Sequence, residues 1–123
     1  MRHVLVLVLA GAAVLAAAPA LARTNAVAHT PQKKTVEIYD NYYGPKKLTV
    51  NPKSRISWQW SEDSADVHDV KLVSAPKGFK KFQTEPASAG YKFSKTLTQP
   101  GTYKFICTMH EEDGMRMTIV VRH

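Results

Sequence analysis

Cysteine is nearly absent from this sequence, which has one, Cys107, among 123 residues. A single cysteine cannot form a disulfide within its own chain, so a fold held by internal disulfides is excluded. The thiol can form a bridge to another molecule, remain free and reactive, or serve as a metal thiolate. Which of these applies depends on the residues around Cys107.

Long helical patterns and blocks of basic residues are also lacking. Beyond the first residues, no stretch has an apolar period of helical length, and we find no internal repeat. The chain has 17 Lys+Arg against 10 Asp+Glu, a net charge of +7, but the lysines are spread along it. Because the aromatic residues form no stacking motif either, we expect no nucleic-acid binding. A net positive charge of this size is just as common in proteins where it serves only solubility.

The first residues have the organisation of a secretory signal. A short basic start precedes the apolar run "VLVLVLAGAAVLAAAPALA" at residues 4–22, which ends in the small-x-small sequence Ala20-Leu21-Ala22. The run is long enough to be a membrane anchor instead, but Pro19 and the cleavage-like site favour a removed signal. We therefore expect a signal peptide at residues 1–22, export to the periplasm or the extracellular face of the membrane, and no stable membrane insertion after cleavage.

The remaining chain consists of short strands and turns that follow a polar, flexible N-terminal arm at residues 23–34. Strands are expected at 35–39, 47–50, 55–60, 67–73, 91–97, 102–107 and 115–121, and turns at 42–45, 51–54 and 98–101. In the longer segment 74–90, Phe79 and Phe82 should pin the chain to the core. Seven or eight such strands predict an all-β fold, an antiparallel sandwich of two sheets, over residues 35–123.

The cysteine ends one of these strands and is followed by two more potential metal ligands. In "YKFICTMHEEDGM", residues 103–115, His110 lies three residues and Met115 eight residues after Cys107. Tyr103, Phe105 and Cys107 share a strand face, so the thiol is expected to point inward at the rim of the core.

A second histidine is expected from elsewhere in the chain. His3 would leave with the signal peptide, His29 lies in the arm, and His123 is the last residue. His68 is the one histidine on an expected strand, and it shares a face with apolar neighbours. The candidate metal ligands are therefore His68, Cys107, His110 and Met115.

Two histidines, a thiolate and a weak thioether are the ligands of a type 1, or blue, copper site. Imidazole suits Cu(II) and sulfur suits Cu(I), so the mixed set is acceptable to both oxidation states. Zinc has no redox chemistry, and its structural sites have four Cys or His ligands. The set predicts one copper ion as the cofactor.

These residues resemble the copper loop of the cupredoxins. "PGTYKFICTMHEEDGM" has the Cys-x2-His-x4-Met spacing of plastocyanin and pseudoazurin, and "YYGPKKLTVNPKSRISWQW" and "DVHDVKL" resemble strands of the same family. The resemblance covers about residues 35–122. It implies an eight-stranded Greek-key sandwich with one copper ion bound by His68, Cys107 and His110, and with Met115 as the axial ligand.

The sequence departs from the family pattern at three places. Asp69 follows the first histidine where the family usually has Asn, and the turn at 51–54 lacks the usual Gly. Met117 replaces a common Gly two positions after the axial methionine, so Met117, and Met109 in the loop, are the other thioethers to consider. We hypothesise that the Asp69 side chain reaches back to Thr108 and braces the ends of the strands.

The resemblance implies a monomeric carrier that moves single electrons between redox proteins, such as c-type cytochromes or copper and haem reductases and oxidases. The alternative is a copper chaperone or storage protein. An enzyme is not expected, because the His-x-His and His-Cys-His clusters of multicopper enzymes do not occur in the sequence. Three acids, Glu111, Glu112 and Asp113, follow His110 and either solvate a turn or form a docking rim for a basic partner.

Overall fold

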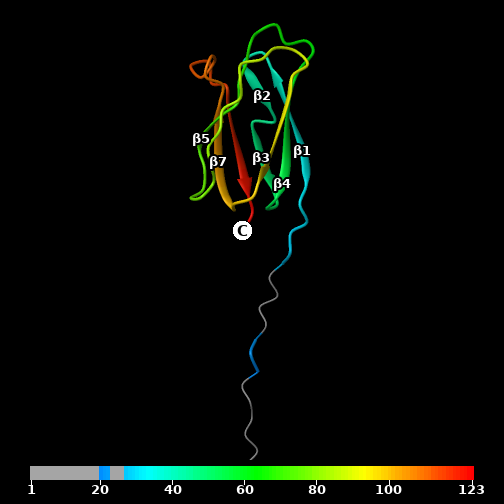
Figure 1. The fold of residues 1–123 in the computed structure, drawn as a ribbon, viewed down its shortest axis with the longest axis vertical. Coiled ribbons are helices and arrows are strands. Elements are labelled where there is room, and N and C mark those ends of the chain that lie inside the picture. Colours follow the sequence, from blue (N-terminus) through cyan, green and yellow to red (C-terminus); the bar gives the residue numbers. More distant parts are fainter. Residues whose placement is uncertain (1–19, 23–26) are drawn as a thin grey trace, which may run out of the picture.

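A computed structural model of the chain describes residues 20–22 and 27–123 (Figure 1). Residues 1–19 of the expected signal peptide and residues 23–26 of the expected arm lie outside the described residues. Within the described ranges, no helix is long and apolar enough to cross a membrane.

The described residues form eight β-strands in two sheets. The strands are β1 (Lys33–Tyr39), β2 (Tyr42–Gly44), β3 (Lys47–Val50), β4 (Ser54–Trp60), β5 (Lys71–Ser74), β6 (Lys92–Leu97), β7 (Gly101–Ile106) and β8 (Arg116–Val121). One sheet has the order β2-β1-β4-β6 and the other has the order β3-β8-β7-β5. The sheets pack face to face (Figure 1), which confirms the expected β-sandwich of about eight strands.

The direction of strand pairing differs in part from the expectation. The pairs β1–β2, β4–β6, β5–β7 and β7–β8 are antiparallel, as expected. The pairs β1–β4 and β3–β8 are parallel, so both sheets are mixed. An alternating pattern predicts which face of a strand is buried but not the direction of its neighbour, so the sequence could not reveal these pairs.

Two segments that were expected to be loop or turn belong to the sheets. Residues 42–45 were expected to be a turn, but Tyr42–Gly44 is strand β2, and the turn is Asp40-Asn41, where Asn41 has a φ of 66°. Asn tolerates this left-handed conformation, so β1 and β2 form a tight hairpin. The arm joins the sandwich earlier than expected, because β1 begins at Lys33 and the Arg55 amide donates to the Gln32 carbonyl oxygen.

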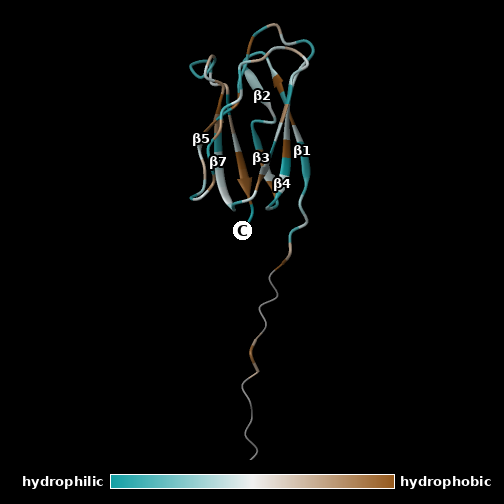
Figure 2. Ribbon diagram, in the orientation of Figure 1, coloured by the Kyte–Doolittle hydropathy of each residue, from teal (hydrophilic) through white to brown (hydrophobic). Residues whose placement is uncertain are grey.

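The core lies between the sheets and follows the alternation of the strands. Hydrophobic positions of the strands alternate with hydrophilic ones in Figure 2. The largest fully buried side chains include Trp58, Tyr43, Tyr103 and Phe105. Phe79 and Phe82 pack against this core, as expected for the segment 74–90. Phe82 contacts the rings of Trp58, Phe93 and Phe105 at centroid distances of 6.2, 5.4 and 6.1 Å.

Three connections meet at the end of the sandwich remote from the C-terminus. They are the Asp40-Asn41 turn, the loop at 61–67 (green in Figure 1) and the loop at 108–114 (orange in Figure 1). Cys107 directly follows β7 at this end, and His68 directly follows the loop at 61–67. The fold therefore brings the candidate ligands from distant parts of the sequence to one edge of the core.

Candidate metal centre

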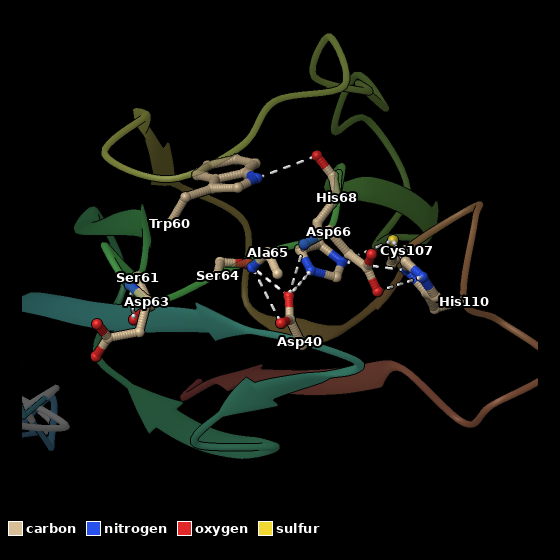
Figure 3. A network of polar contacts seen from close by, with 10 residues as sticks. All are labelled: Asp40, Trp60, Ser61, Asp63, Ser64, Ala65, Asp66, His68, Cys107 and His110. Carbon is tan, nitrogen blue, oxygen red and sulfur yellow. Dashed lines mark hydrogen bonds and ion pairs between the residues drawn. The ribbon is translucent and has the colours of Figure 1, made fainter.

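Three of the candidate ligands present donor atoms to one another. His68 Nδ1 lies 3.1 Å from His110 Nδ1, and Cys107 Sγ lies 3.9 Å from His68 Nδ1 and 3.6 Å from His110 Nδ1. His68 and Cys107 are fully buried, and the His110 side chain is 17% exposed. The donor atoms therefore form a compact triangle at the edge of the core, as drawn in Figure 3.

The size of this triangle fits a transition-metal ion. The point equidistant from the corners of a triangle with these sides lies about 2.1 Å from each corner, and metal–nitrogen and metal–sulfur bonds in proteins are about 2.0–2.3 Å long. Two imidazoles with one thiolate match the trigonal donor set of blue copper. The arrangement and the chemistry of the donors both fit a copper ion held by His68, Cys107 and His110.

His68 is held in place by both its backbone and its ring. Its backbone forms an isolated bridge with Ala87, with two N–H···O bonds of 2.9 Å, and its carbonyl oxygen accepts the indole N–H of Trp60 at 3.1 Å. Its ring Nε2 lies 3.0 Å from Asp40 Oδ1. The regular strand β5 begins only at Lys71, so His68 precedes the strand on which it was expected, although His68, Val70 and Leu72 are all buried as predicted.

Cys107, His110 and Met115 lie on a loop that closes on its own backbone. The Cys107 amide donates to the Met115 carbonyl oxygen at 3.0 Å, and the Met115 amide donates to the His110 carbonyl oxygen at 3.1 Å. Gly114 has a φ of 80°, a left-handed conformation that other residues adopt at a cost. The loop thus returns to the strand Arg116–Val121 with its three candidate ligands in a fixed relation.

Asp69 joins the histidine segment to this loop, which confirms the hypothesis that it reaches Thr108. The Thr108 amide donates to Asp69 Oδ1 and the Thr108 hydroxyl donates to Asp69 Oδ2, both at 2.7 Å. Gln83 Nε2 donates to Oδ2 at 2.8 Å, and the buried Tyr43 hydroxyl donates to the Asp69 carbonyl oxygen at 2.7 Å. These bonds hold the segments of His68 and Cys107 together without a metal.

Burial of Cys107 favours the protonated thiol in the metal-free protein. Burial raises its pKa above the usual range, although backbone N–H groups of Asp69, Met109 and His110 act in the opposite direction. A metal binds the thiolate, so metal binding would release this proton.

The methionines differ in their surroundings. Met115 is fully buried, whereas Met109 is 42% exposed. Met117 is also buried, but its sulfur accepts a hydrogen bond from the Trp58 indole N–H at 3.5 Å. The Met117 sulfur is therefore occupied within the core.

Asp40 was not identified from the sequence. Its carboxylate accepts bonds from the Ser64 hydroxyl and from the Ala65 and Asp66 amides, and it contacts His68 (Figure 3). The bond with His68, together with those from Ala65, Asp66 and Ser64, holds the pKa of Asp40 well below its usual range, so it is ionised. From the sequence, Asp40 lies between an expected strand at 35–39 and an expected turn at 42–45, and this position does not indicate a contact with a histidine.

Comparison with known proteins agrees with this geometry. A sequence model described as "Copper binding proteins, plastocyanin/azurin family" matches residues 31–122. A plastocyanin of Prochlorothrix hollandica is 32% identical over 125 residues, covering 95% of this chain and 87% of its own length. Among solved structures, the pseudoazurin of Sinorhizobium meliloti has a TM-score of 0.63 at 22% identity over 75% of each chain, which shows the fold. A reduced Cu(I) form of an amicyanin mutant has a TM-score of 0.62 at 28% identity, covering 73% of this chain and 82% of its own.

Proposed function

This chain belongs to the plastocyanin/azurin family of copper-binding proteins, and on that premise we propose that it is a small exported carrier of single electrons. His68, Cys107 and His110 would hold one copper ion, with Met115 as the axial ligand. The observation that carries the proposal is the triangle of two Nδ1 atoms and one Sγ atom. Bound copper would supply the one-electron change between Cu(II) and Cu(I).

The surroundings of the donor atoms suit electron transfer because they leave little to rearrange. Cys107 and His68 are buried, and Asp69 bonds to Thr108 beside Cys107. The loop from Cys107 to Met115 is closed by its own backbone hydrogen bonds. Donor atoms that are held in this way cannot move far when the charge of the centre changes, which lowers the cost of each transfer.

Met115 is the favoured axial ligand. Of the three methionines near the centre, Met109 is largely exposed and Met117 bonds to Trp58 through its sulfur. Met115 is buried, and its backbone bonds to both Cys107 and His110.

The partners that we propose are redox proteins such as c-type cytochromes or copper and haem reductases and oxidases. His110 is the partly exposed member of the ligand set, so electrons would leave through its edge. Glu111, Glu112 and Asp113 lie in the loop that follows it, which is hydrophilic in Figure 2. We propose that this acidic rim docks a partner with a basic face, because a few charges set the orientation and rate of a transient encounter.

A copper chaperone or storage protein is the alternative that must be separated from a carrier. Either would bind copper, but a carrier must hold Cu(I) and Cu(II) in the same site and pass electrons quickly. We propose a carrier and not an enzyme, working as a monomer outside the cytoplasm after removal of residues 1–22.

The test is the electron self-exchange rate of the copper-loaded mature protein, measured by nuclear magnetic resonance on mixtures of the reduced and oxidised forms. We expect rapid exchange and reversible voltammetry. Slow exchange, or release of copper on reduction, would favour the chaperone or storage function instead. His123→Ala is a matched control, because His123 is an exposed histidine outside the ligand set and its loss should leave the rate unchanged.

A further inference from the structure

The two ring nitrogens of His68 have different partners. Nδ1 faces His110 Nδ1 and Cys107 Sγ, whereas Nε2 lies 3.0 Å from Asp40 Oδ1. The His68 side chain is completely buried, and that of Asp40 is 36% exposed. A carboxylate thus lies directly behind the ring, on the side away from the other donor atoms.

The Asp40 carboxylate has three hydrogen-bond partners besides His68. Oδ1 accepts the Ser64 hydroxyl at 2.8 Å and the Asp66 amide at 3.1 Å, and Oδ2 accepts the Ala65 amide at 3.0 Å (Figure 3). The loop at 61–67 therefore wraps the carboxylate and fixes it before any metal binds. The start of this loop is also tied to β1, because the Ser61 amide donates to the Ile38 carbonyl oxygen at 2.9 Å.

We propose that Asp40 is a positioning residue of the copper centre: it accepts the Nε2 proton of His68, turns the Nδ1 lone pair toward the ion, and makes His68 a stronger ligand for Cu(II) than for Cu(I). The proposal deepens the proposed function and rests on its assignment of His68 as a ligand.

The chemistry follows from the two nitrogens of a neutral imidazole. One nitrogen carries the proton and the other has the free lone pair, so a partner that accepts from Nε2 leaves Nδ1 free to bind. A carboxylate acceptor also pulls on the Nε2 proton, which raises the electron density at Nδ1. The more highly charged Cu(II) gains more from that density than Cu(I) does, so the reduction potential falls.

His110 offers an internal comparison. Its Nε2 lies 3.8 Å from Asp66 Oδ2, which is too long for a hydrogen bond, and the Asp66 side chain is 57% exposed. A carboxylate thus lies near each histidine, but only the one behind His68 is hydrogen-bonded to the ring and held by the loop. Asp40→Asn and Asp66→Asn each remove one negative charge and form a matched pair.

The experiment measures the affinities of each variant for Cu(II) and Cu(I) by competition with chelators, together with the reduction potential. Loss of a partner of this kind costs about 10–100-fold in metal affinity. We expect Asp40→Asn to lower the affinity for Cu(II) at least about tenfold relative to that for Cu(I), which raises the potential by about 59 mV or more. Asp66→Asn should change this ratio less than about threefold, and the change should fade as salt rises.

An equal loss of both affinities in Asp40→Asn, or a change no larger than that in Asp66→Asn, would overturn the proposal, because a merely structural role does not discriminate between oxidation states. If Asp40→Asn does not fold, the unaltered Cu(I) protein decides by nitrogen-15 resonance spectroscopy. We expect a His68 Nε2–H proton at low field that exchanges slowly with water, and a fast-exchanging or absent proton would overturn the proposal. Slow self-exchange would remove the carrier function and leave the affinity ratio in place, so the two failures are distinguishable.

Discussion

At the scale of single residues, two carboxylates act on different parts of the centre. Asp40 contacts the ring of His68, whereas Asp69 bonds to the backbone and side chain of Thr108 in the next segment. Asp40 thus acts on a single ligand, the ring of His68. Asp69 instead holds the segment of His68 against the segment of Cys107.

Asp69→Asn should raise the reduction potential while the protein keeps its colour. The amide oxygen can still accept the Thr108 amide, and the Thr108 hydroxyl and Gln83 amide can reverse their roles, so the fold survives. Loss of a negative charge near the ion lowers the affinity for Cu(II) relative to that for Cu(I). Each tenfold change in this affinity ratio raises the potential by about 59 mV. Voltammetry measures this, and an unchanged or lower potential with an intact spectrum would count against the role of Asp69.

Leucine substitutions at the two buried methionines should separate the axial ligand from the packing residue. Met115→Leu should shift both the spectrum and the potential, because the axial ligand tunes a blue-copper site. Met117→Leu should keep the spectrum but lose about 1–3 kcal/mol of unfolding free energy, because Leu and Met have similar volumes but the buried Trp58 N–H loses its acceptor. If Met117→Leu alters the spectrum and Met115→Leu does not, the axial ligand has been misassigned.

The convergence of His68, Cys107 and His110 could be predicted because each residue has a local signal. Cys107 ends an alternating strand, His110 follows it at a short spacing, and His68 was the one histidine among apolar strand positions. Asp40 had no such signal. Its contact with His68 depends on the hairpin, on the parallel pairing of β1 with β4, and on the path of the loop at 61–67, and none of these is encoded in a local pattern.

At the scale of elements, the alternation of the strands predicted most of the sandwich but not its directions or its shortest strand. The three residues of β2 are too few to show an alternating pattern, so they were interpreted as part of a turn. The expected strand at 67–73 begins only at Lys71, where pairing with β7 begins; before it, the Asp69 side chain takes the Thr108 amide and the Thr84 hydroxyl takes the Val70 amide. Side-chain acceptors of this kind shorten a strand without changing which face is buried.

Lys53→Gly should stabilise the protein, because Lys53 occupies the turn where the sequence lacks the glycine usual in the family. Lys53 has a φ of 65° and is exposed, so the substitution removes backbone strain and little else. A left-handed conformation costs a non-glycine residue about 1–2 kcal/mol, and glycine removes this cost. Glycine is itself destabilising by about 0.5–1 kcal/mol, because it has more conformational entropy in the unfolded chain. We expect a net gain of roughly 0.5–1 kcal/mol in urea unfolding of the metal-free protein.

Lys47→Gly is the control for this prediction. Lys47 is an exposed lysine in the strand β3 and has no left-handed backbone, so glycine there should be destabilising. Equal effects of the two substitutions would mean that the conformation of Lys53 carries no strain.

At the scale of the whole molecule, charge is distributed unevenly. The chain has a net charge of +7, yet the loops at 61–67 and 108–114 contain acids and no lysine or arginine. The acids in these loops are Glu62, Asp63, Asp66, Glu111, Glu112 and Asp113. These two loops beside the metal centre are therefore acidic on a basic molecule, although Glu111 is paired with Arg116 at 3.1 Å. Such an uneven charge orients an approaching charged partner.

Neutralising the acidic rim should remove most of the salt dependence of electron transfer to a basic partner such as a c-type cytochrome. Salt at 0.1 M screens exposed charges beyond about 10 Å, so the rate for the unaltered protein should fall as salt rises. Glu111→Gln, Glu112→Gln and Asp113→Asn together should flatten this dependence and leave the colour unchanged. Stopped-flow rates over a range of salt concentrations measure it.

The matched control replaces three exposed lysines, Lys77, Lys80 and Lys81, in the segment between β5 and β6. If the lysines form the docking surface, the rim variant keeps its salt dependence and the lysine variant loses it. The two rate-versus-salt curves therefore identify the face that meets the partner.

The most direct test of the central claim is the visible and paramagnetic resonance spectrum of the mature protein after addition of Cu(II). A thiolate and two imidazoles on one copper ion predict an intense blue or green charge-transfer band, with the narrow copper hyperfine splitting of a type 1 site. Cys107→Ala should abolish the band, because it removes the sulfur from the donor triangle. A colourless copper complex of the unaltered protein, or a band that persists in Cys107→Ala, would contradict the account.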